Sequence, residues 1–418
     1  MPKILRNPLF LGSLFFSMQL FLILFICPEK NLLQAWLSLA SHWDSEWYEA
    51  IAKFGYINID GPLHSGLQNA NVVFFPGYPY LVRACILLFG IDAKIALLLV
   101  SQTATLCFWC LFFYILRHIK WHEQFYAALL VMTFPTSWFM FTGYSESLFM
   151  LMCCLMLWLA MEKRWLLSGI SGVFMTSTRI IGIPVLIAPL LSIIAIKSSE
   201  FSPFIRSNLR TLSPPTVTAI FGSLGCLGFL TLCAIQFGSW HLYFDMERIN
   251  WKGTADPLFL FKLPTWVPPP FGYNIDLAPP LPNAYEPLFS LKCFKLAAYT
   301  FSETLVPIFL WISILFSIAM FKRTHRHDTR SLTWYFGAVL LFLFTCFSLS
   351  TRHYESMSRC LYPVWILLII SDVIHPEKVF LFRLSRFKLN SAIIAIVFIS
   401  FGFWLQLLNR FLLGWWVA

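Results

Sequence analysis

Residues 43–48 (WDSEWY) stand about one helix length after the first apolar run of the chain and place an aspartate between aromatic residues. Residues 74–79 (FFPGYP) follow in the same polar stretch, and most of the remaining chain is apolar. Acidic residues inside or beside a membrane are rare and tend to mark functional positions. Asp44 is therefore the first residue to consider for function.

The composition indicates an integral membrane protein. Hydrophobic residues make up 58% of the 418, and charged residues only 12%, against about 25% in a soluble domain. We therefore expect one polytopic membrane domain over residues 1–418. The net charge of +10 does not indicate nucleic-acid binding, because the basic residues lie in short loops between apolar runs. The eleven cysteines form no spaced framework and mostly lie inside apolar runs, where cysteine behaves as a small hydrophobic residue.

Apolar runs predict eleven membrane spans in an all-α fold. A span needs ~20 apolar residues. Runs of about that length occur near residues 8–27, 93–116, 124–141, 145–161, 216–237, 296–320, 332–350 and 389–409, and shorter runs near 166–178, 181–196 and 361–374. The first run resembles a signal peptide but lacks a small-residue cleavage site, so we interpret it as a span.

The basic residues predict the orientation, because loops rich in lysine and arginine stay on the cytoplasmic side. They cluster at the N-terminus and after residues 116, 161, 196, 320 and 374. This pattern is consistent only if residues 78–90, a short run with Arg83 inside it, lie at the interface without spanning. The prediction is then a cytoplasmic N-terminus, an outer C-terminus and two long outer loops, residues 28–92 and 238–295.

Residues 42–54 in the first outer loop predict a short amphipathic helix, with Trp43, Trp47, Ile51 and Phe54 on its apolar face. Asp44 and Tyr48 lie one turn apart on another face. Glu49 and Lys53 form a helix-supporting pair four residues apart. The ordinary interpretation of Asp44 is a helix-start residue, with Ser41 in a capping arrangement.

A metal site formed by Asp44 and Glu46 has little support. Residues two apart on a helix point in different directions, so one helix does not aim both carboxylates at one ion. No metal ligand and no cofactor is therefore predicted, and a divalent metal stays unsupported.

Several motifs in chain order are similar to those of one family. They are WD at 43–44, IAxxGY at 51–56, FFPGYP at 74–79, FP at 134–135, GYSESLF at 143–149, TRxxG at 178–182, QFG at 236–238 and SRCLYP at 358–363. Together they resemble the PIG-V family, the second mannosyltransferase of GPI-anchor synthesis, with its bacterial relatives. The matches extend over most of the chain, and the first motif is the most specific.

The resemblance implies a GT-C glycosyltransferase. These multi-spanning enzymes take a sugar from a polyprenyl phosphate on the outer or lumenal face. Similar folds have a long first outer loop that carries the key aspartate and short interfacial helices, followed by a non-spanning helix. That arrangement agrees with the charge-based interpretation of residues 78–90.

This chemistry needs a base for the acceptor hydroxyl, and a positioned carboxylate contributes about 10²–10⁴-fold in rate. We assign that role to Asp44. The departing lipid phosphate needs cations, and arginine suits bidentate phosphate contact. Arg179, Arg352 and Arg359 are the candidates, although each also has an ordinary interpretation as an interfacial arginine.

Three further residues are predicted to bind substrate: Glu46, Tyr48 and Glu146. Glu146 also has an ordinary interpretation, because an acid favours the start of a helix.

The predicted function is inverting transfer of a sugar, with mannose expected from the resemblance, to an envelope glycan or glycolipid. A bacterial inner membrane is favoured over the endoplasmic reticulum. The alternatives are a GPI-anchor mannosyltransferase, another GT-C transferase that modifies lipid A or proteins, and a flippase or transporter of lipid-linked sugars. The last predicts charges near mid-bilayer and paired broken helices, and such charges are few here. The sequence does not indicate whether a partner subunit exists.

Overall fold

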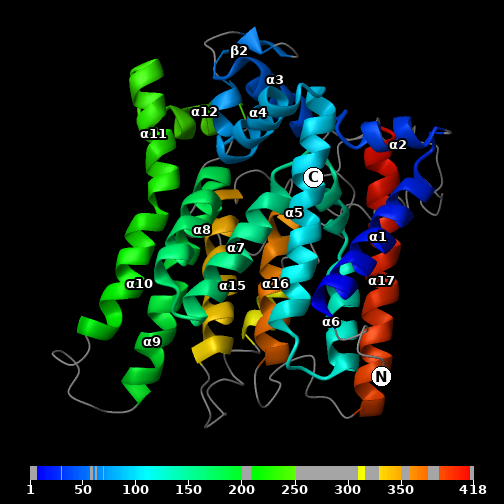
Figure 1. Cartoon of the computed structure of the whole chain (residues 1–418), viewed down its shortest axis with the longest axis vertical. Coiled ribbons are helices and arrows are strands. Elements are labelled where there is room, and N and C mark those ends of the chain that lie inside the picture. The colour runs from blue at the N-terminus through cyan, green and yellow to red at the C-terminus, as the bar shows by residue number, and fades with distance from the viewer. Residues whose placement is uncertain are drawn as a thin grey trace, which may run out of the picture.

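The computed structural model describes residues 7–29, 31–56, 60–61, 64–68, 70–199, 209–250, 309–315, 329–349, 357–374 and 386–414. Most of these residues are helical, and most of the long helices run roughly along one direction (Figure 1). The first predicted outer loop adds a short antiparallel pair, β1 (Asp60–Gly61) with β2 (His64–Gln68). The second predicted outer loop lies outside the described residues from position 251 to its end.

Five helical segments are long and apolar enough to cross a membrane, with lengths of 19 to 26 residues. They are Pro8–Ile26, Ala93–Ile115, Leu212–Phe237, Thr329–Ser348 and Ile393–Leu412. Their mean hydropathies of 1.6 to 2.3 make burial in lipid favourable, so the chain is an integral membrane protein. The figure of eleven spans stays a prediction, and one of those runs, near 296–320, is described only at 309–315.

Most of the long helices coincide with predicted apolar runs. In chain order the helices are α1 (Pro8–Ile26), α2 (Leu32–Ser38), α3 (Asp44–Phe54), α4 (Gly77–Phe89), α5 (Ala93–Ile115), α6 (Trp121–Met132), α7 (Glu146–Met161), α8 (Trp165–Thr178), α9 (Ala188–Ser199), α10 (Leu209–Gly222), α11 (Leu224–Phe237), α12 (Leu242–Asn250), α15 (Thr329–Leu349), α16 (Met357–Ile374) and α17 (Arg386–Leu412). Short 3-10 turns lie between them: η2 (Ala70–Val73), η3 (Ser137–Phe141), η4 (Ile180–Gly182) and η5 (Pro184–Ile187).

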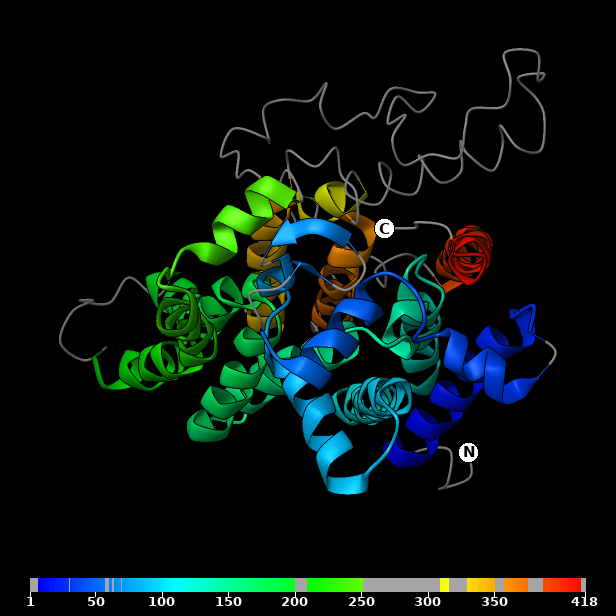
Figure 2. The same cartoon turned by 90° about the horizontal axis from the view of Figure 1, so that it is seen from above.

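Helix α4 has 13 residues, fewer than a membrane crossing needs. In Figure 2, α5 is seen end-on whereas α4 is seen along its length, so α4 lies across the direction of α5. It ends at Gly90, whose φ of 63° is in the left-handed region that glycine adopts without strain. This geometry is that of a helix lying across the bundle, and the face of the membrane on which it lies stays a prediction.

The apolar run predicted as a span near residues 124–141 is not one continuous helix. Helix α6 ends at Met132, and the chain turns before the 3-10 segment η3. Pro135 lies in this turn, where proline has no N–H for a helical hydrogen bond. The turn contacts the start of α16: the Thr136 hydroxyl donates a hydrogen bond to the Ser358 carbonyl at 3.1 Å.

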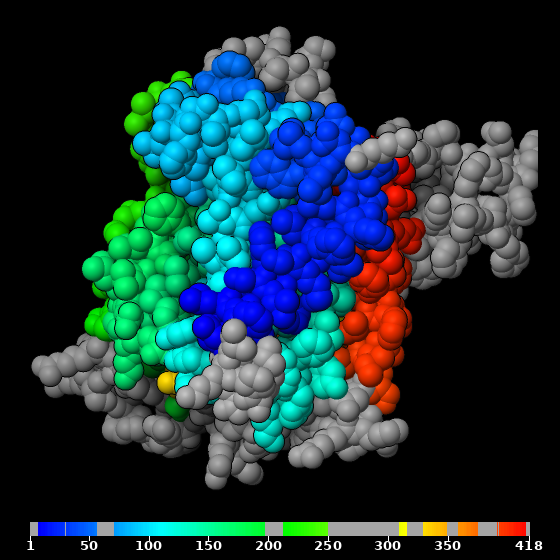
Figure 3. All heavy atoms as spheres, turned by 45° about the vertical axis from the view of Figure 1, so that its right-hand side comes forward, coloured from blue at the N-terminus to red at the C-terminus, as the bar shows by residue number. Residues whose placement is uncertain are grey.

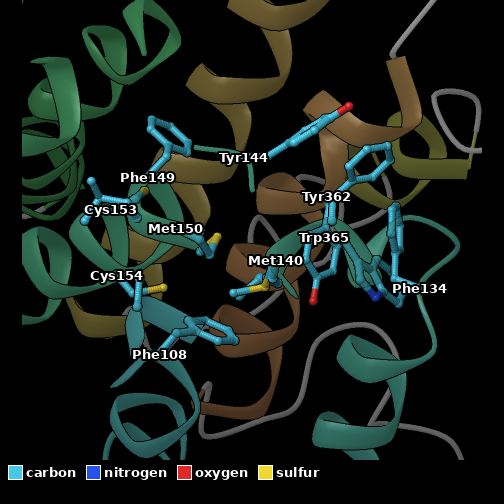
Figure 4. Packing of buried hydrophobic residues seen from close by; sticks show 14 of the residues in the cluster. Phe108, Phe134, Met140, Tyr144, Phe149, Met150, Cys153, Cys154, Tyr362 and Trp365 are labelled. Atoms are coloured by element: carbon cyan, nitrogen blue, oxygen red, sulfur yellow. The ribbon is translucent and has the colours of Figure 1, made fainter. Parts of the chain in front are cut away.

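Helix α16 is fixed against α6 by buried aromatic side chains. The Tyr362 hydroxyl donates to the Val131 carbonyl at 3.1 Å, and the Trp365 indole N–H donates to the Leu130 carbonyl at 2.9 Å. Phe134 stacks on Tyr362 with ring centroids 5.1 Å apart. Figure 4 shows these rings beside the sulfur-containing side chains of the core. The first turn of α16 is thereby held next to the loop that precedes α7.

Candidate functional site

Four of the predicted site residues meet in one cluster, although they come from four separate segments. Arg359 contacts both carboxylates: its terminal nitrogen lies 2.8 Å from Asp44 Oδ2, and its Nε lies 3.1 Å from Glu146 Oε1. The same Glu146 oxygen accepts a hydrogen bond from Arg179 at 3.0 Å. We call this group the charged cluster; its members are Asp44, Glu146, Arg179 and Arg359.

Asp44 is the first residue of α3, as the helix-start interpretation predicts. Ser41 does not cap this helix, because its hydroxyl donates instead to the Leu37 carbonyl at 3.0 Å. The chain enters α3 through Trp43, whose φ of 54° is unusual for a bulky residue. Such strain persists where the surrounding packing holds it, and it often accompanies functional sites.

Glu146 is the first residue of α7, and the loop before it is docked on the segment before α3. The Gly143 N–H donates to the Leu39 carbonyl at 3.0 Å. A Cβ at Gly143 would lie 3.0 Å from the Ala40 Cβ, so this close approach favours glycine. Two loops distant in sequence are thus held together, and the two acidic residues of the cluster with them.

Arg179 directly follows α8, at the break between the two short apolar runs. The FFPGYP motif packs against this end of α8. A Cβ at Gly77 would lie 2.6 Å from the Ser177 hydroxyl oxygen and 2.9 Å from the Ser177 carbonyl carbon. Glycine in the motif therefore allows α4 to contact the turn that carries Arg179.

Arg359 lies in the first turn of α16 between two aromatic rings. Its guanidinium carbon is 5.2 Å from the centroid of Phe139 and 5.3 Å from that of Tyr144. A cation at this distance from a ring face is attracted by the ring. Neither ring was among the predicted site residues. The GYSESLF motif contained Tyr144, whereas Phe139 lies in a run that hydropathy assigns to a span.

The charged cluster is nearly dry. Side-chain exposure is 12% for Asp44, 4% for Glu146, 16% for Arg179 and 8% for Arg359. Buried charges are costly unless paired, and two arginines here balance two carboxylates. Within the described part of the chain, Glu146 Oε2 is buried and has no hydrogen-bond partner. One carboxylate oxygen of the cluster is therefore left without a hydrogen bond from the described residues.

Tyr48 extends the cluster on the side of α3. Its hydroxyl lies 2.7 Å from that of Ser145, the residue before Glu146, and its ring contacts Phe74 and Tyr78. Burial raises the pKa of the Tyr48 phenol, so this group stays neutral at physiological pH.

Two predicted site residues remain, Glu46 and Arg352. Glu46 is half-buried in the first turn of α3, two residues from Asp44, so its side chain leaves the helix in another direction. Arg352 lies outside the described residues.

Among the residues that the structure describes, no three His, Cys, Asp or Glu side chains gather as metal ligands would. The two carboxylates of the cluster each contact an arginine. His241 and Asp245 of the second predicted outer loop contact each other, with Nδ1 and Oδ2 2.5 Å apart.

Comparison with known proteins supports the resemblance that the motifs suggest. No family model matches the chain. Its sequence is 30% identical over 138 residues to human GPI alpha-1,6-mannosyltransferase 2. The chain resembles PIG-V. The match covers 29% of this chain and 25% of the human protein, so the chain spans about a quarter of the length of that relative.

Solved structures give a more distant likeness. The oligosaccharyltransferase AglB of Archaeoglobus fulgidus, in complex with an inhibitory peptide and a dolichol-phosphate, aligns at a TM-score of 0.41 and 13% identity. That alignment covers 97% of this chain and 56% of AglB. The apo form of the Archaeoglobus fulgidus oligosaccharyltransferase aligns at a TM-score of 0.40 and 13% identity, over 92% of this chain and 52% of that one.

Proposed function

We propose that this protein is a membrane glycosyltransferase. It takes a sugar, mannose in the first instance, from a polyprenyl-phosphate donor and transfers it to a hydroxyl of a glycan or glycolipid on the non-cytoplasmic face. The observation that carries this proposal is the charged cluster, in which a carboxylate at a helix start meets two arginines in a nearly dry setting. The sequence similarity to a mannosyltransferase supports the same choice.

In the proposed reaction the acceptor oxygen attacks the anomeric carbon of the donor sugar. The new C–O bond forms as the bond from the anomeric carbon to the phosphate oxygen breaks, and its electron pair leaves on the polyprenyl phosphate. Asp44 takes the proton of the acceptor hydroxyl. Attack from the face opposite the phosphate inverts the anomeric centre.

Arg359 and Arg179 are proposed to bind the donor phosphate and to stabilise the charge that develops when it leaves. Guanidinium groups present several N–H donors in a planar fork that matches phosphate. In the present arrangement Arg359 is directed at Asp44 and Glu146. A phosphate that attracts Arg359 leaves Asp44 Oδ2 available to the acceptor hydroxyl, so donor binding prepares the base.

Glu146 is proposed as a positioning residue. One of its oxygens contacts both arginines, whereas the buried Oε2 has no hydrogen-bond partner among the described residues. That oxygen is suited to accept a hydrogen bond from a hydroxyl of the donor sugar. A buried acceptor of this kind favours ligands that supply the missing donor.

The decisive experiment is a transfer assay with purified protein, radiolabelled polyprenyl-phosphate mannose and a membrane lipid extract as the acceptor pool. We expect label to move into a lipid or glycan product, and polyprenyl-phosphate glucose serves as the specificity control. Failure of the protein to transfer or release sugar from either donor would contradict the proposal.

The sidedness is tested with an impermeant thiol reagent on intact cells. Asp92 is exposed at the start of α5, directly after α4. A cysteine at this position is expected to react from outside, with the unaltered protein as the control for native cysteines. Reaction only after the membrane is opened places this end of α5 on the cytoplasmic side.

A further inference from the structure

A second polar site lies beside the charged cluster. A cavity of about 430 Å³ opens between the end of α1, helix α2 and the end of α17. Its polar walls are formed by Glu29, Gln34, Ser38, Ser41 and His42. Figure 3 shows the first two helices, in blue, next to α17 in red on one face of the molecule.

The cavity wall is suited to hydroxyl groups. Ser41 also accepts a hydrogen bond from Lys94 Nζ at 3.2 Å. Burial, with a smaller effect of the charge on Lys94, lowers the pKa of His42, so its imidazole is neutral at pH 7 and offers one donor and one acceptor. Small-molecule sites are usually lined mostly by apolar groups with a few polar ones. Hydroxyl, amide, imidazole and carboxylate groups together instead fit an uncharged ligand with many hydroxyls.

The wall of the cavity is close to Asp44 along the chain. His42 is two residues before Asp44, so their Cα atoms are at most about 7 Å apart. The His42 carbonyl accepts a hydrogen bond from the Tyr144 hydroxyl at 3.2 Å, and the ring of Tyr144 faces the Arg359 guanidinium. Tyr144 therefore stands between the cavity wall and Arg359, while the short segment from His42 to Asp44 connects the cavity with the base.

The surroundings of the cavity are apolar and exposed. Phe25 near the end of α1 is 76% exposed, Leu32 and Leu33 of α2 are 69% and 58% exposed, and Leu413 just after α17 is 57% exposed. Helices α1 and α17 contain two of the five segments that can cross the membrane. A polar cavity with an apolar rim at the end of such helices fits an amphiphile, with its head in the cavity and its tail in the lipid.

We propose that this cavity binds the hydroxyl-rich head group of a lipid-linked acceptor and presents one of its hydroxyls to Asp44. The proposal rests on the proposed function and extends it, because it separates an acceptor site at α2 and α17 from a donor phosphate site at Arg359 and Arg179. The cavity volume is that of a site for a small head group, such as one or two sugars.

The kinetic test uses Ser38→Trp, which fills the cavity from α2. The control is Leu166→Trp, which adds the same ring at an exposed position of α8, away from the cavity. The acceptor probe is a diglycosyl diacylglycerol in nanodiscs, with diacylglycerol as the lipid without a sugar head. Ser38→Trp is expected to raise the acceptor KM at least tenfold with the donor KM unchanged, and Leu166→Trp to behave as the unaltered protein. Equal acceptor KM values for the two variants would overturn the proposal while leaving the transferase function intact.

A binding test does not depend on transfer. A photoreactive benzoylphenylalanine at Gln34, on the cavity wall, is expected to crosslink to radiolabelled diglycosyl diacylglycerol more than to labelled diacylglycerol. The same residue at Leu166, 71% exposed on α8, controls for general lipid contact. Equal crosslinking at the two positions, or no preference for the sugar-bearing lipid, overturns the cavity assignment even where no transfer is detected. Crosslinking at Gln34 without transfer by the unaltered protein contradicts the proposed function alone.

Discussion

Helix α3 carries two ion pairs that differ in almost every physical respect. In its second half, Glu49 pairs with Lys53, four residues later, with Oε1 and Nζ 2.5 Å apart. The exposed fractions of their side chains are 17% and 42%. At its first turn, Asp44 reaches Arg359 from the far end of the chain, and both side chains are nearly dry. The first pair follows from helix spacing alone, whereas the second exists only because several segments converge.

The two pairs differ in the free-energy cost of removing their charges from water. An exposed pair at this spacing stabilises a helix by roughly 0.2–0.5 kcal/mol. A buried pair has to offset the removal of both ions from water, and apolar replacements are often as stable or more so. Apolar residues in place of Asp44 and Arg359 would therefore stabilise the fold about as well as this ion pair does. The presence of charges at this position favours a chemical role.

The largest expected difference between the two pairs is in turnover. Asp44→Asn removes the proposed base and keeps the size of the side chain, so kcat/KM for transfer is expected to fall by about 10²–10⁴-fold. Glu49→Gln is the matched control on the same helix, with an expected change of less than about twofold because the pair is exposed. Steady-state transfer assays on the two variants measure this, and near-normal turnover of Asp44→Asn would remove it as the base.

The next comparison is between the cations of the two pairs, Arg359 and Lys53. Arg359→Gln leaves two buried carboxylates with fewer partners, and loss of a buried partner costs about 3–5 kcal/mol. We expect a lower unfolding temperature and a raised donor KM, whereas Lys53→Gln changes neither appreciably. Arg359→Lys keeps the charge but not the planar fork, so it should restore stability more than donor affinity. A variant Arg359→Gln with unaltered donor KM excludes Arg359 as a phosphate ligand.

A smaller effect, on the affinity for phosphate, distinguishes the ion-pairing role of Asp44 from its proposed role as the base. In the proposed mechanism Asp44 and a donor phosphate compete for Arg359. Asp44→Asn is therefore expected to bind sugar-free polyprenyl phosphate several-fold more tightly than the unaltered protein. Competition against a labelled donor in nanodiscs measures this affinity, with Glu49→Gln as the reference. Weaker phosphate binding by Asp44→Asn contradicts the release of Arg359 by the donor.

The smallest expected effect concerns His42, just before α3. Burial lowers its pKa below 6.5 in the folded protein, so the unfolded chain binds a proton at a higher pH than the folded one. Stability from this group is present above about pH 6.5 and is lost as the pH falls through the folded pKa. Because His42 is only half-buried, the loss of stability is expected to be small. Between pH 7 and pH 5.5 the unfolding temperature should fall more for the unaltered protein than for His42→Gln. An equal fall in the two proteins would contradict the prediction.

The candidate site was predictable in part. Asp44, Glu146 and Arg179 are conspicuous because charge is scarce in this chain, and Glu146 and Arg179 also stand at the ends of apolar runs. The Glu49–Lys53 pair and the break at Arg179 follow from local spacing and run length, and the structure contains both. Arg359 was distinguished from other interfacial arginines only by its motif. The roles assigned to these residues stay predictions.

The break after α6 illustrates what local patterns miss. Hydropathy over residues 124–141 is continuous, because a buried turn is as apolar as a buried helix. Pro135 was the available signal, but a single proline can also kink a helix without ending it. The turn matters because Thr136 holds the start of α16, and Phe139 of the following 3-10 segment faces Arg359.

The sequence by itself determined that this chain lies in a membrane and which of its scarce charges stand at helix ends, because hydropathy and charge are properties of neighbouring residues. Only the tertiary structure decided that Asp44, Glu146, Arg179 and Arg359 share one dry cluster with a polar cavity beside it. That convergence depends on close approaches at Gly77 and Gly143 and on the seat for α16, and these are contacts between segments far apart in the chain.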